Sequence, residues 1–353
     1  MRIAQVSPLY ESVPPKLYGG TERVVSVLTE ELVRQGHDVT LFASADSRTS
    51  ARLRAACDQA LRLRGKAVID PLACHVRMLE MVAREADQFD AVHFHVDYLH
   101  FPVTRREAIP AVTTLHGRLD IPELVPLYRE FSEMRLVSIS NAQRAPLAFA
   151  NWIATVHHGL PAQNFQAREK SGQYLAFLGR ICPEKRPDRA VEIACRAGVP
   201  LKVAAKVDAA DQEYFDSKIR ALFDHPLVEF MGEISEGEKS EFLGNALALL
   251  FPIDWPEPFG LALIEAMACG TPAIAYRQGS VPEIVEDGVT GYIVHNLPEA
   301  VAAVGRIGSI DRRTCRRVFE QRFSVERMCR DYLEVYKRLQ VPDARQGERG
   351  LAA

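Results

Sequence analysis

Strand-like and helix-like patterns alternate along the whole chain, and this alternation limits the fold more than any other feature of the sequence. Short apolar or β-branched runs predict strands, and longer runs with a helical period lie between many of them. Because parallel strands need crossover helices, the alternation predicts α/β architecture with doubly wound parallel sheets. The predicted strands cover residues 3–7, 39–43, 91–95, 111–115, 136–139, 153–156, 174–178, 201–205, 228–231, 247–251, 273–276 and 292–294. The predicted helices include residues 22–34, 72–86, 187–197, 211–223 and 236–244.

The pattern restarts near residue 174, after a polar stretch without clear periodicity at 163–173. A chain of 353 residues exceeds one ordinary domain, so we predict two domains joined by this stretch. Residues 324–339 have the pattern of a last amphipathic helix, and 341–353 form a polar tail. Open α/β sheets bind ligands beyond the carboxyl ends of their strands, so two such sheets in tandem predict a binding cleft between them.

The run WPEPFGLALIEAMACGTPAIA, which contains Glu257 and Glu265, carries the strongest functional signal. Every residue from 261 to 268 except Glu265 is apolar, which predicts a buried helix holding one carboxylate. A buried carboxylate needs hydrogen-bond donors, and a helix N-terminus attracts anions such as phosphate through its unpaired N–H groups. Side chains lean toward the helix N-terminus, so we expect Glu265 to reach back toward the amides of residues 259–261. A nucleotide sugar suits both features, since it carries a diphosphate and a ribose diol.

Two cations, Arg180 and Lys185, follow the predicted strand at 174–178, and Pro187 suits the first position of the next helix. They therefore belong to a loop beyond the carboxyl end of a strand. Arginine can grip a diphosphate through two donors, while lysine acts as a mobile point charge. Taken alone the pair is better explained as a solvated basic loop, but its combination with the acidic run favours phosphate binding.

Two further candidates lie in the first half of the chain. Gly19 and Gly20 precede a predicted helix, where glycines let a ligand approach the backbone; the alternative is a simple glycine turn. His116 ends a predicted strand, where it could hydrogen-bond a sugar hydroxyl or a reacting oxygen. The alternative for His116 is a structural histidine at a loop.

A cluster of histidines raises the question of a metal. Period-two alternation would put His93, His95 and Asp97 on one face of a strand, with His100 nearby. No second local cluster completes a ligand set, so we predict no metal site. A basic cluster near the C-terminus is predicted to be the solvated face of a helix, with contact to anionic lipid as the alternative. Its members are Arg312, Arg313, Arg316 and Arg317.

Charge and composition exclude several classes of protein. The formal net charge of -3 provides no global basic field to recruit nucleic acid. No stretch approaches the ~18 uninterrupted apolar residues of a membrane span, and the first residues lack the apolar core of a signal peptide. The 7 cysteines show no CxxC and no zinc-like spacing, which indicates reduced thiols of a cytoplasmic protein.

Four segments together resemble the retaining glycosyltransferases of family 4, whose GT-B fold consists of two facing Rossmann-like domains. They are YGGTER (18–23), LHG (115–117), FLGRICPEKRPDRAVEIA (177–194) and EPFGLALIEAMACGTPAIA (257–275), the last carrying the family's Glu-x7-Glu signature. The resemblance implies an acceptor-side domain at 1–162 and a nucleotide-sugar donor domain at 163–323. It also implies that a helix at 324–340 crosses back to the first domain, followed by a tail at 341–353.

The resemblance assigns roles to individual residues. Arg180 and Lys185 would bind the donor diphosphate, and Glu257 would contact the donor sugar. Glu265 would hold the ribose, and His116 would lie beside the sugar and the reacting bond. Further donor contacts would come from Gly20, Met231, Gly232, Phe259, Gly260 and Leu261.

Two positions depart from the family pattern. HHGLP (157–161) stands where a turn containing Asn-Gly-Val-Asp is common, and Arg186 stands where glycine is frequent. The first departure puts the turn that links the domains in doubt. The second alters the diphosphate loop only slightly.

These observations predict a cytoplasmic hexosyltransferase that moves a sugar from a nucleoside-diphosphate donor to an acceptor hydroxyl with retention, without a metal or other cofactor. UDP is the default nucleotide and GDP the alternative. The acceptor could be a saccharide, a lipid-linked molecule or a small molecule, and a lipid acceptor would bring contact with a membrane surface. The alternatives are a nucleotide-sugar epimerase of the same fold and a non-catalytic bilobed binding protein. Glycoside hydrolysis by Glu257 and Glu265 as a carboxylate pair fits the loop-and-helix arrangement less well than ribose binding does. A dehydrogenase is disfavoured because the sequence lacks the dinucleotide-binding glycine fingerprint.

Overall fold

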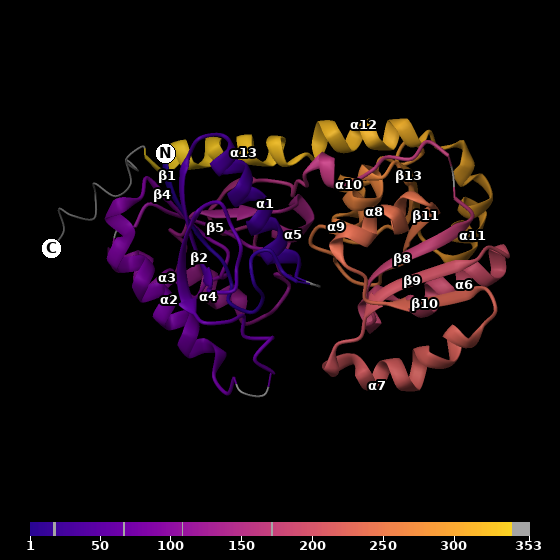
Figure 1. The fold of residues 1–353 in the computed structure, drawn as a ribbon, viewed down its shortest axis with the longest axis horizontal. Helices are drawn as coiled ribbons and strands as arrows, with labels where there is room; N and C mark the ends of the chain where they lie inside the picture. Colours follow the sequence, from indigo (N-terminus) through magenta and orange to yellow (C-terminus); the bar gives the residue numbers. More distant parts are fainter. Residues whose placement is uncertain (17–18, 66–67, 108, 171, 341–353) are drawn as a thin grey trace. The chain divides into compact units, whose positions relative to one another are not determined.

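The computed structural model describes residues 1–16, 19–65, 68–107, 109–170 and 172–340, which form two compact units (Figure 1). Unit 1 consists of Met1–Ile139, Pro146–Val156 and the C-terminal residues from Glu326 onward. Unit 2 consists of Ser140–Ala145 and His157–Val325. The long segment of unit 2 therefore begins at His157, a few residues before the predicted boundary at 162, and the residues after 325 belong to unit 1. Residues 17, 18 and 341–353, including Tyr18 of YGGTER and the predicted tail, lie outside the described part.

Unit 1 is built on a seven-stranded sheet in which the described strands pair in parallel. Its order is β3-β2-β1-β4-β5-β6-β7, so the strand order reverses between β1 and β4. Ligands of open α/β sheets bind outside the carboxyl ends of the strands at such a reversal. The strands are β1 (Arg2–Val6), β2 (Asp38–Ser44), β3 (Arg52–Cys57), β4 (Ala91–Phe94), β5 (Ala111–Thr114), β6 (Leu136–Ser138) and β7 (Trp152–Thr155).

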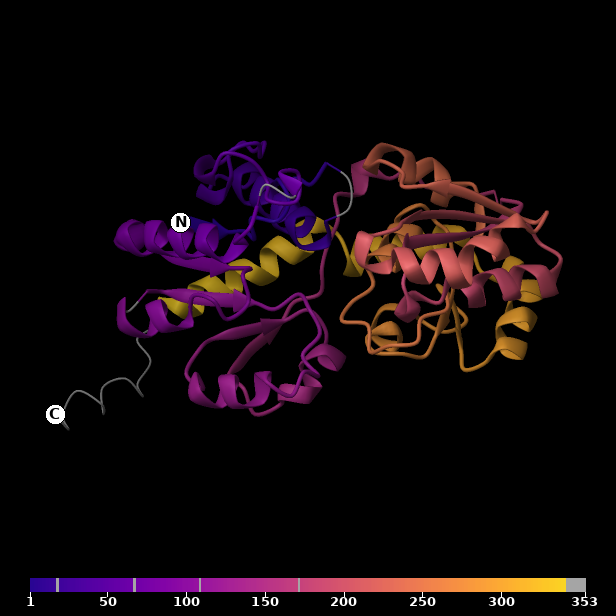
Figure 2. The same cartoon turned by 90° about the horizontal axis from the view of Figure 1, so that it is seen from below.

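Helices cover the sheet of unit 1, and the last of them comes from the far end of the sequence. In Figure 2 this helix, α13 (Val325–Leu339), is drawn in yellow beside the strands of unit 1. Its Tyr332 and Tyr336 are fully buried and hydrogen-bond side chains of β5, β1 and β4. The remaining helices are α1 (Gly20–Arg34), α2 (Pro71–Glu85), α3 (Phe101–Glu107) and α4 (Leu124–Glu130), with single turns at η2 (Ala86–Gln88) and η3 (Ala145–Leu147).

Unit 2 contains a six-stranded parallel sheet with the order β10-β9-β8-β11-β12-β13. The order reverses between β8 and β11, so the loops after these two strands lie at the expected ligand position of this unit. The strands are β8 (Tyr174–Arg180), β9 (Leu201–Lys206), β10 (Val228–Gly232), β11 (Ala246–Phe251), β12 (Ala273–Tyr276) and β13 (Gly291–Val294).

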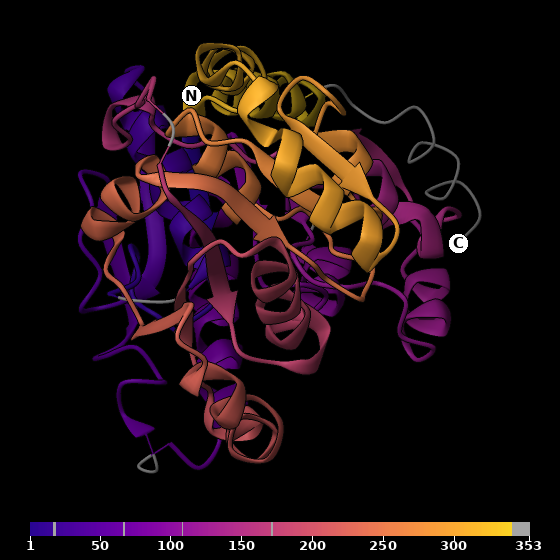
Figure 3. The same ribbon diagram turned by 90° about the vertical axis from the view of Figure 1, so that its right-hand side faces the viewer.

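The helices of unit 2 lie on both faces of its sheet, as Figure 3 shows. Helix α6 (Pro187–Ala197) packs against α11 (Leu297–Arg306), and their apolar residues join the strands in one core. Helix α9 (Leu261–Ala268) contacts α8 (Glu236–Gly244) and α12 (Arg312–Arg322). The sequence sets the helix ends locally: α6 begins with a proline and ends at Gly198 in the left-handed conformation, and Ser235 and Glu238 form a capping box on α8. The short helices are α5 (Asn141–Arg144), α7 (Gln212–Tyr214), α10 (Val281–Ile284), η4 (Ala162–Asn164), η5 (Pro183–Lys185) and η9 (Ile307–Ser309).

The predicted alternation of strands and helices is confirmed, and every predicted strand overlaps an observed one. One strand, β3, was not predicted. It lies at the edge of its sheet and carries the exposed residues Arg52 and Arg54, so its sequence shows no apolar run.

The predicted helix at 211–223 forms as a series of short turns rather than one regular helix. They are η6 (Ala209–Asp211), α7, the wide turn η7 (Phe215–Ile219) and η8 (Arg220–Asp224). Phe215 and Ile219 are buried, so the apolar face of the segment is still used.

Two expectations about polar clusters are wrong in part. β4 ends at Phe94, and Asp97 lies beyond it with φ 50, so Asp97 does not share a strand face with His93 and His95. Arg312 is buried rather than solvated and donates to the carbonyl oxygens of Arg168, Gly244 and Ala246. It therefore fixes the beginning of β11 instead of forming a charged surface.

Candidate functional site

The loop between β11 and α9 carries three of the predicted site residues, Glu257, Phe259 and Gly260. Its last residue, Gly260, is the N-cap of α9 and has φ 87, which places it in the left-handed region. An added Cβ would lie 3.1 Å from Leu263 Cδ1 and 3.3 Å from Phe251 Cζ. Glycine is needed here for both reasons, and it lets the first amides of α9 be approached closely. The predicted buried helix forms over the apolar run, with Leu261 as its first residue.

Glu257 and Lys185 form an ion pair between the two loops at the switch point of unit 2. Lys185 Nζ donates to Glu257 Oε2, and Trp255 Nε1 donates to the same oxygen at 2.9 Å. The Lys185 and Glu257 side chains retain only 18% and 10% of their exposure. The Lys185 ammonium also lies 5.1 Å from the centre of the Trp255 ring and 5.4 Å from that of Phe251. The loop after β8 thus supplies a cation, and the loop after β11 supplies the anion and aromatic walls that hold it.

The backbone of Glu257 is fixed from the other side by the turn that follows β12. Gly279 has φ 51, and a Cβ on it would come within 2.4 Å of the nitrogen and oxygen of Glu257. Ser280 N donates to Glu257 O at 2.9 Å, and Ser280 Oγ donates to Phe259 O at 2.8 Å. Phe259 itself is 2% exposed and packs edge-on against His158, as expected for a residue that supports the loop.

Arg180 lies close to two acids of another loop, Asp208 and Asp211. Its NH1 lies 3.5 Å from Asp208 Oδ2, and its Nε lies 3.6 Å from Asp211 Oδ2. Both carboxylates follow β9, the neighbouring strand. The Arg180 side chain keeps 38% of its exposure, so water or a ligand can reach it.

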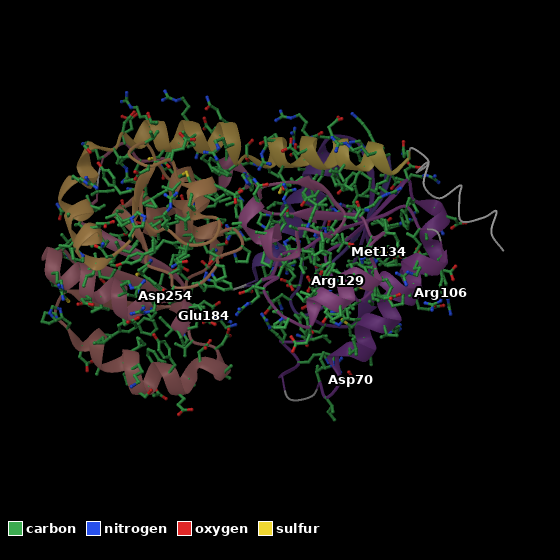
Figure 4. All side chains as sticks on the ribbon, turned by 180° about the vertical axis from the view of Figure 1, so that it is seen from behind. Asp70, Arg106, Arg129, Met134, Glu184 and Asp254 are labelled. Atoms are coloured by element: carbon green, nitrogen blue, oxygen red, sulfur yellow. The ribbon has the colours of Figure 1, made fainter. Side chains whose placement is uncertain are left out.

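Arg186 occupies the position where the family pattern favours glycine, and its backbone explains the preference. It has φ 53 and ψ 55, a left-handed conformation that glycine adopts without steric cost. Its guanidinium donates to Asp188, and its NH1 donates to Asp254 Oδ2 at 2.9 Å. Asp254 N also donates to Glu184 O at 2.8 Å; Figure 4 labels these two residues, which lie side by side. Arg186 therefore connects the loop of Lys185 with the loop of Glu257.

Glu265 is 2% exposed inside α9, as its apolar neighbours predicted. Lys239 Nζ of α8 donates to Glu265 Oε1 at 3.1 Å and also pairs with Glu236 at 2.8 Å. A lysine from a neighbouring helix thus balances the buried carboxylate, a partner that the sequence did not reveal. Nothing in the segment around Lys239 distinguishes it from a surface lysine.

The remaining predicted donor contacts belong to other elements. Met231 and Gly232 end β10, the edge strand of unit 2, where Met231 is 42% exposed and Gly232 has φ 72. Gly20 is the first residue of α1 in unit 1, immediately after the β1 loop. Two residues further along, in the first turn of α1, the buried Glu22 accepts a hydrogen bond from Glu11 N at 3.3 Å.

His116 follows β5 in unit 1 and is half-buried. Its Nε2 lies 2.9 Å from Nδ1 of His95, and burial lowers the pKa of His116 to about 3. His116 is therefore a neutral imidazole at ordinary pH. The other histidines of the cluster hydrogen-bond core residues of unit 1. His93 bonds Tyr336, His95 bonds Gln5, and His100 bonds Thr113. Within the described residues, no group of three or more His, Cys, Asp or Glu side chains could hold a metal ion.

The link between the first and second halves of the chain is fixed within unit 2 by Glu283. Its carboxylate accepts from Asn141 N at 2.8 Å and Ala142 N at 2.7 Å, and His157 Nε2 lies at 3.4 Å. Ser140 Oγ donates to Pro258 O at 2.7 Å. The HHGLP turn, although it departs from the family pattern, is thus held by its own set of contacts.

None of the helices in the described part of the chain has the length and apolar character needed to cross a membrane. All 7 cysteines are free thiols, as their spacing predicted.

Comparisons with known proteins agree with this architecture. Residues 18–160 match the family described as Glycosyltransferase Family 4, and residues 162–310 match Glycosyl transferases group 1. The D-inositol 3-phosphate glycosyltransferase of Mycolicibacterium smegmatis is 29% identical over 179 residues, which are 47% of this chain and 40% of that protein. The match thus spans less than half the length of that relative.

Two solved structures share the fold over nearly their whole length. AviGT4, a glycosyltransferase involved in avilamycin A biosynthesis, superimposes with a TM-score of 0.73 at 23% identity, covering 97% of this chain and 98% of AviGT4. HepE of Anabaena, solved in complex with UDP and glucose, gives a TM-score of 0.75 at 16% identity, covering 96% of this chain and 99% of HepE. With its two parallel α/β sheets, the protein has the GT-B fold and belongs to the group 1, family 4 glycosyltransferases.

Proposed function

We propose that this protein transfers a sugar from a nucleoside-diphosphate sugar to an acceptor hydroxyl, with retention of the anomeric configuration and without a metal ion. The observation that carries the proposal is the Lys185–Glu257 pair at the switch point of unit 2, beside the N-terminus of α9. Unit 2 would bind the donor, and unit 1 would supply the acceptor side. The free cysteines support a cytoplasmic enzyme.

The chemical task is to stabilise negative charge that grows on the leaving diphosphate as the sugar becomes cationic. Lys185 and Arg180 supply positive charge for this, and the amides of residues 259–261 add donors at a helix N-terminus. Each well-placed donor of this kind is worth on the order of 3 kcal/mol in known sites. Because Lys185 donates to Glu257, a bound phosphate would share the lysine with this carboxylate.

The two acids of the run have different tasks in this proposal. Glu257, which remains slightly exposed, would accept from hydroxyls of the donor sugar. Glu265, balanced by Lys239 in the interior of α9, would accept from the ribose diol. The edge-strand residues Met231 and Gly232 would lie beside the base of the nucleotide, and Gly20 would lie near the phosphates or the acceptor.

UDP is the proposed nucleotide, supported by the UDP held in HepE, which shares the fold. A thermal-shift panel with UDP, GDP, ADP and their common sugar conjugates tests this, since a ligand that binds the folded state raises the melting temperature. We expect UDP and a UDP-sugar to give the largest shifts. Equal small shifts of the melting temperature for all nucleotides would contradict a donor site. A larger shift with GDP than with UDP would identify GDP as the donor nucleotide.

A variant then tests the assignment of Glu265. Glu265→Gln should weaken UDP binding through the ribose, as measured by calorimetry. A matched comparison with 2′-deoxy-UDP separates this role from general damage, because the variant should lose the discrimination between the two nucleotides. An unchanged affinity for UDP would contradict the ribose assignment.

A further inference from the structure

A continuous chain of buried polar side chains crosses unit 1 and ends at His116. Gln5 of β1 and His93 of β4 are register partners on paired strands, so their side chains point to the same face of the sheet. Helix α13 supplies tyrosines over that face. The members other than His116 are at most 2% exposed: Gln5, His93, His95, Thr114, Tyr332 and Tyr336.

The first half of this chain connects His116 to helix α13. His116 Nε2 lies 2.9 Å from His95 Nδ1, and His95 Nε2 lies 2.9 Å from Gln5 Oε1. The other end of the same amide, Gln5 Nε2, donates to the Tyr336 hydroxyl at 2.9 Å. The amide of Gln5 is therefore held between a histidine and a tyrosine.

The second half continues from Tyr336 back into the sheet. The Tyr336 hydroxyl lies 2.8 Å from His93 Nδ1, and His93 Nε2 lies 2.7 Å from Thr114 Oγ1. Thr114 Oγ1 in turn lies 3.0 Å from the Tyr332 hydroxyl. Four hydrogen bonds thus separate Tyr332 from Gln5, whereas Tyr336 bonds Gln5 directly.

The hydrogen-bonding roles follow from the orientation of the Gln5 amide. Its carbonyl oxygen can only accept, so His95 must carry its proton on Nε2. Burial disfavours charged imidazoles, as the lowered pKa values of His93 and His116 indicate. A neutral His95 protonated on Nε2 has a bare Nδ1, and this nitrogen can only accept from His116 Nε2.

We propose that Gln5 and His95, oriented by Tyr336, hold His116 as the neutral tautomer protonated on Nε2, so that its Nδ1 is a hydrogen-bond acceptor. Gln5, His95 and Tyr336 are positioning residues. The group that His116 recognises in a ligand is therefore a donor such as a sugar hydroxyl. A diphosphate oxygen, itself an acceptor, is excluded as its partner. The effect of this tautomer on catalysis rests on the proposed function, whereas the assignment of the tautomer rests on the hydrogen bonds alone.

Two matched variants test the proposal. Tyr336→Phe and Tyr332→Phe each remove one buried hydroxyl from the same face of α13, one turn apart. Only the first removes the partner that orients the Gln5 amide. Imidazole 15N chemical shifts of the ligand-free protein report the tautomer directly, with the His116 signals assigned by their loss in His116→Ala.

In the wild type and in Tyr332→Phe we expect His116 to be protonated on Nε2 only. In Tyr336→Phe, and in Gln5→Leu, we expect a mixture of both tautomers. With a donor and acceptor in hand, kcat/KM should fall about tenfold in Tyr336→Phe, the factor expected for one hydrogen bond, and stay within about twofold in Tyr332→Phe.

A wild-type His116 protonated on Nδ1, or equal effects of the two tyrosine variants on the 15N shifts, would overturn the proposal. Because the shifts are recorded without substrate, these outcomes are independent of whether the protein transfers a sugar. Absence of any transferase activity together with the expected tautomers would instead count against the proposed function alone.

Discussion

The Lys185–Glu257 pair offers the sharpest test of the site, because it has both a stability effect and a binding effect. Removing one partner of a fully buried pair costs ~3–5 kcal/mol, since the other charge is left uncompensated. Here the side chains keep 18% and 10% of their exposure, so water screens part of the cost. We therefore expect Lys185→Met to lower the free energy of unfolding of unit 2 by ~2–3 kcal/mol. Adding Glu257→Gln removes the stranded charge and should restore most of that loss.

A double-mutant cycle on thermal unfolding measures this coupling, which we expect to be ~2 kcal/mol. Lys239 and Glu265, at 3.1 Å and with similar burial, provide a matched control pair in the same unit. Calorimetry with UDP adds the second readout: Lys185→Met should weaken binding by ~10- to 100-fold, a loss of ~1.5–3 kcal/mol typical of a hydrogen bond to a charged group. Lys239→Met, which removes no proposed phosphate contact, should weaken it less. A Lys185→Met protein that is destabilised but binds UDP like the wild type would refute phosphate binding by Lys185.

Three further outcomes are expected. Arg186→Ala should be destabilised by ~1 kcal/mol more than Arg186→Gly in chemical unfolding, because alanine keeps the left-handed backbone cost that glycine avoids; equal stabilities would argue against strain at this residue. Burial acts to raise the pKa of Glu283, but hydrogen bonds from His157 and two amides outweigh it and lower the pKa to about 2. Its ionised form therefore stabilises the fold above the unfolded pKa of ~4.3, and this contribution is lost as the pH falls from there toward 2; urea unfolding at pH 6 and pH 3 should show a smaller pH dependence in Glu283→Gln. Finally, transferase activity should survive EDTA, and activity that returns only with an added divalent ion would contradict the metal-free proposal.

The strands and their order of appearance could be predicted because each buried parallel strand is a short apolar run bounded by polar residues. The edge strand β3 could not, since its outward side chains are charged and give no such run. The helix at Pro187–Ala197 could be predicted to the residue because a proline at its start and Gly198 at its end mark it locally. Local signals of this kind need no knowledge of the rest of the fold.

The sequence marks the candidate site residues but not the side chains that pair with them. Glu265 stands out as the one carboxylate in an apolar run, and Glu257 and Lys185 gain weight from their placement near that run and after a strand. Lys239 and Tyr336 carry no such mark, because their roles arise only when distant segments meet; Tyr336 lies 243 positions from its partner His93. The family resemblance supplied the roles of the first group and gave no information on the second. The predicted cleft between the two domains stays a prediction.

The position of α13 has a consequence for how the protein is made. Synthesis completes nearly all of unit 2 before the tyrosines of this helix emerge from the ribosome, although the strands they cover were made first. Until then Gln5, His93 and Thr114 have no cover from α13, and the nascent unit 1 exposes a polar seam in its sheet. Domains usually fold in the order in which they are translated. Here synthesis of unit 1 starts first but is completed last. We therefore expect a chaperone to bind the nascent N-terminal half.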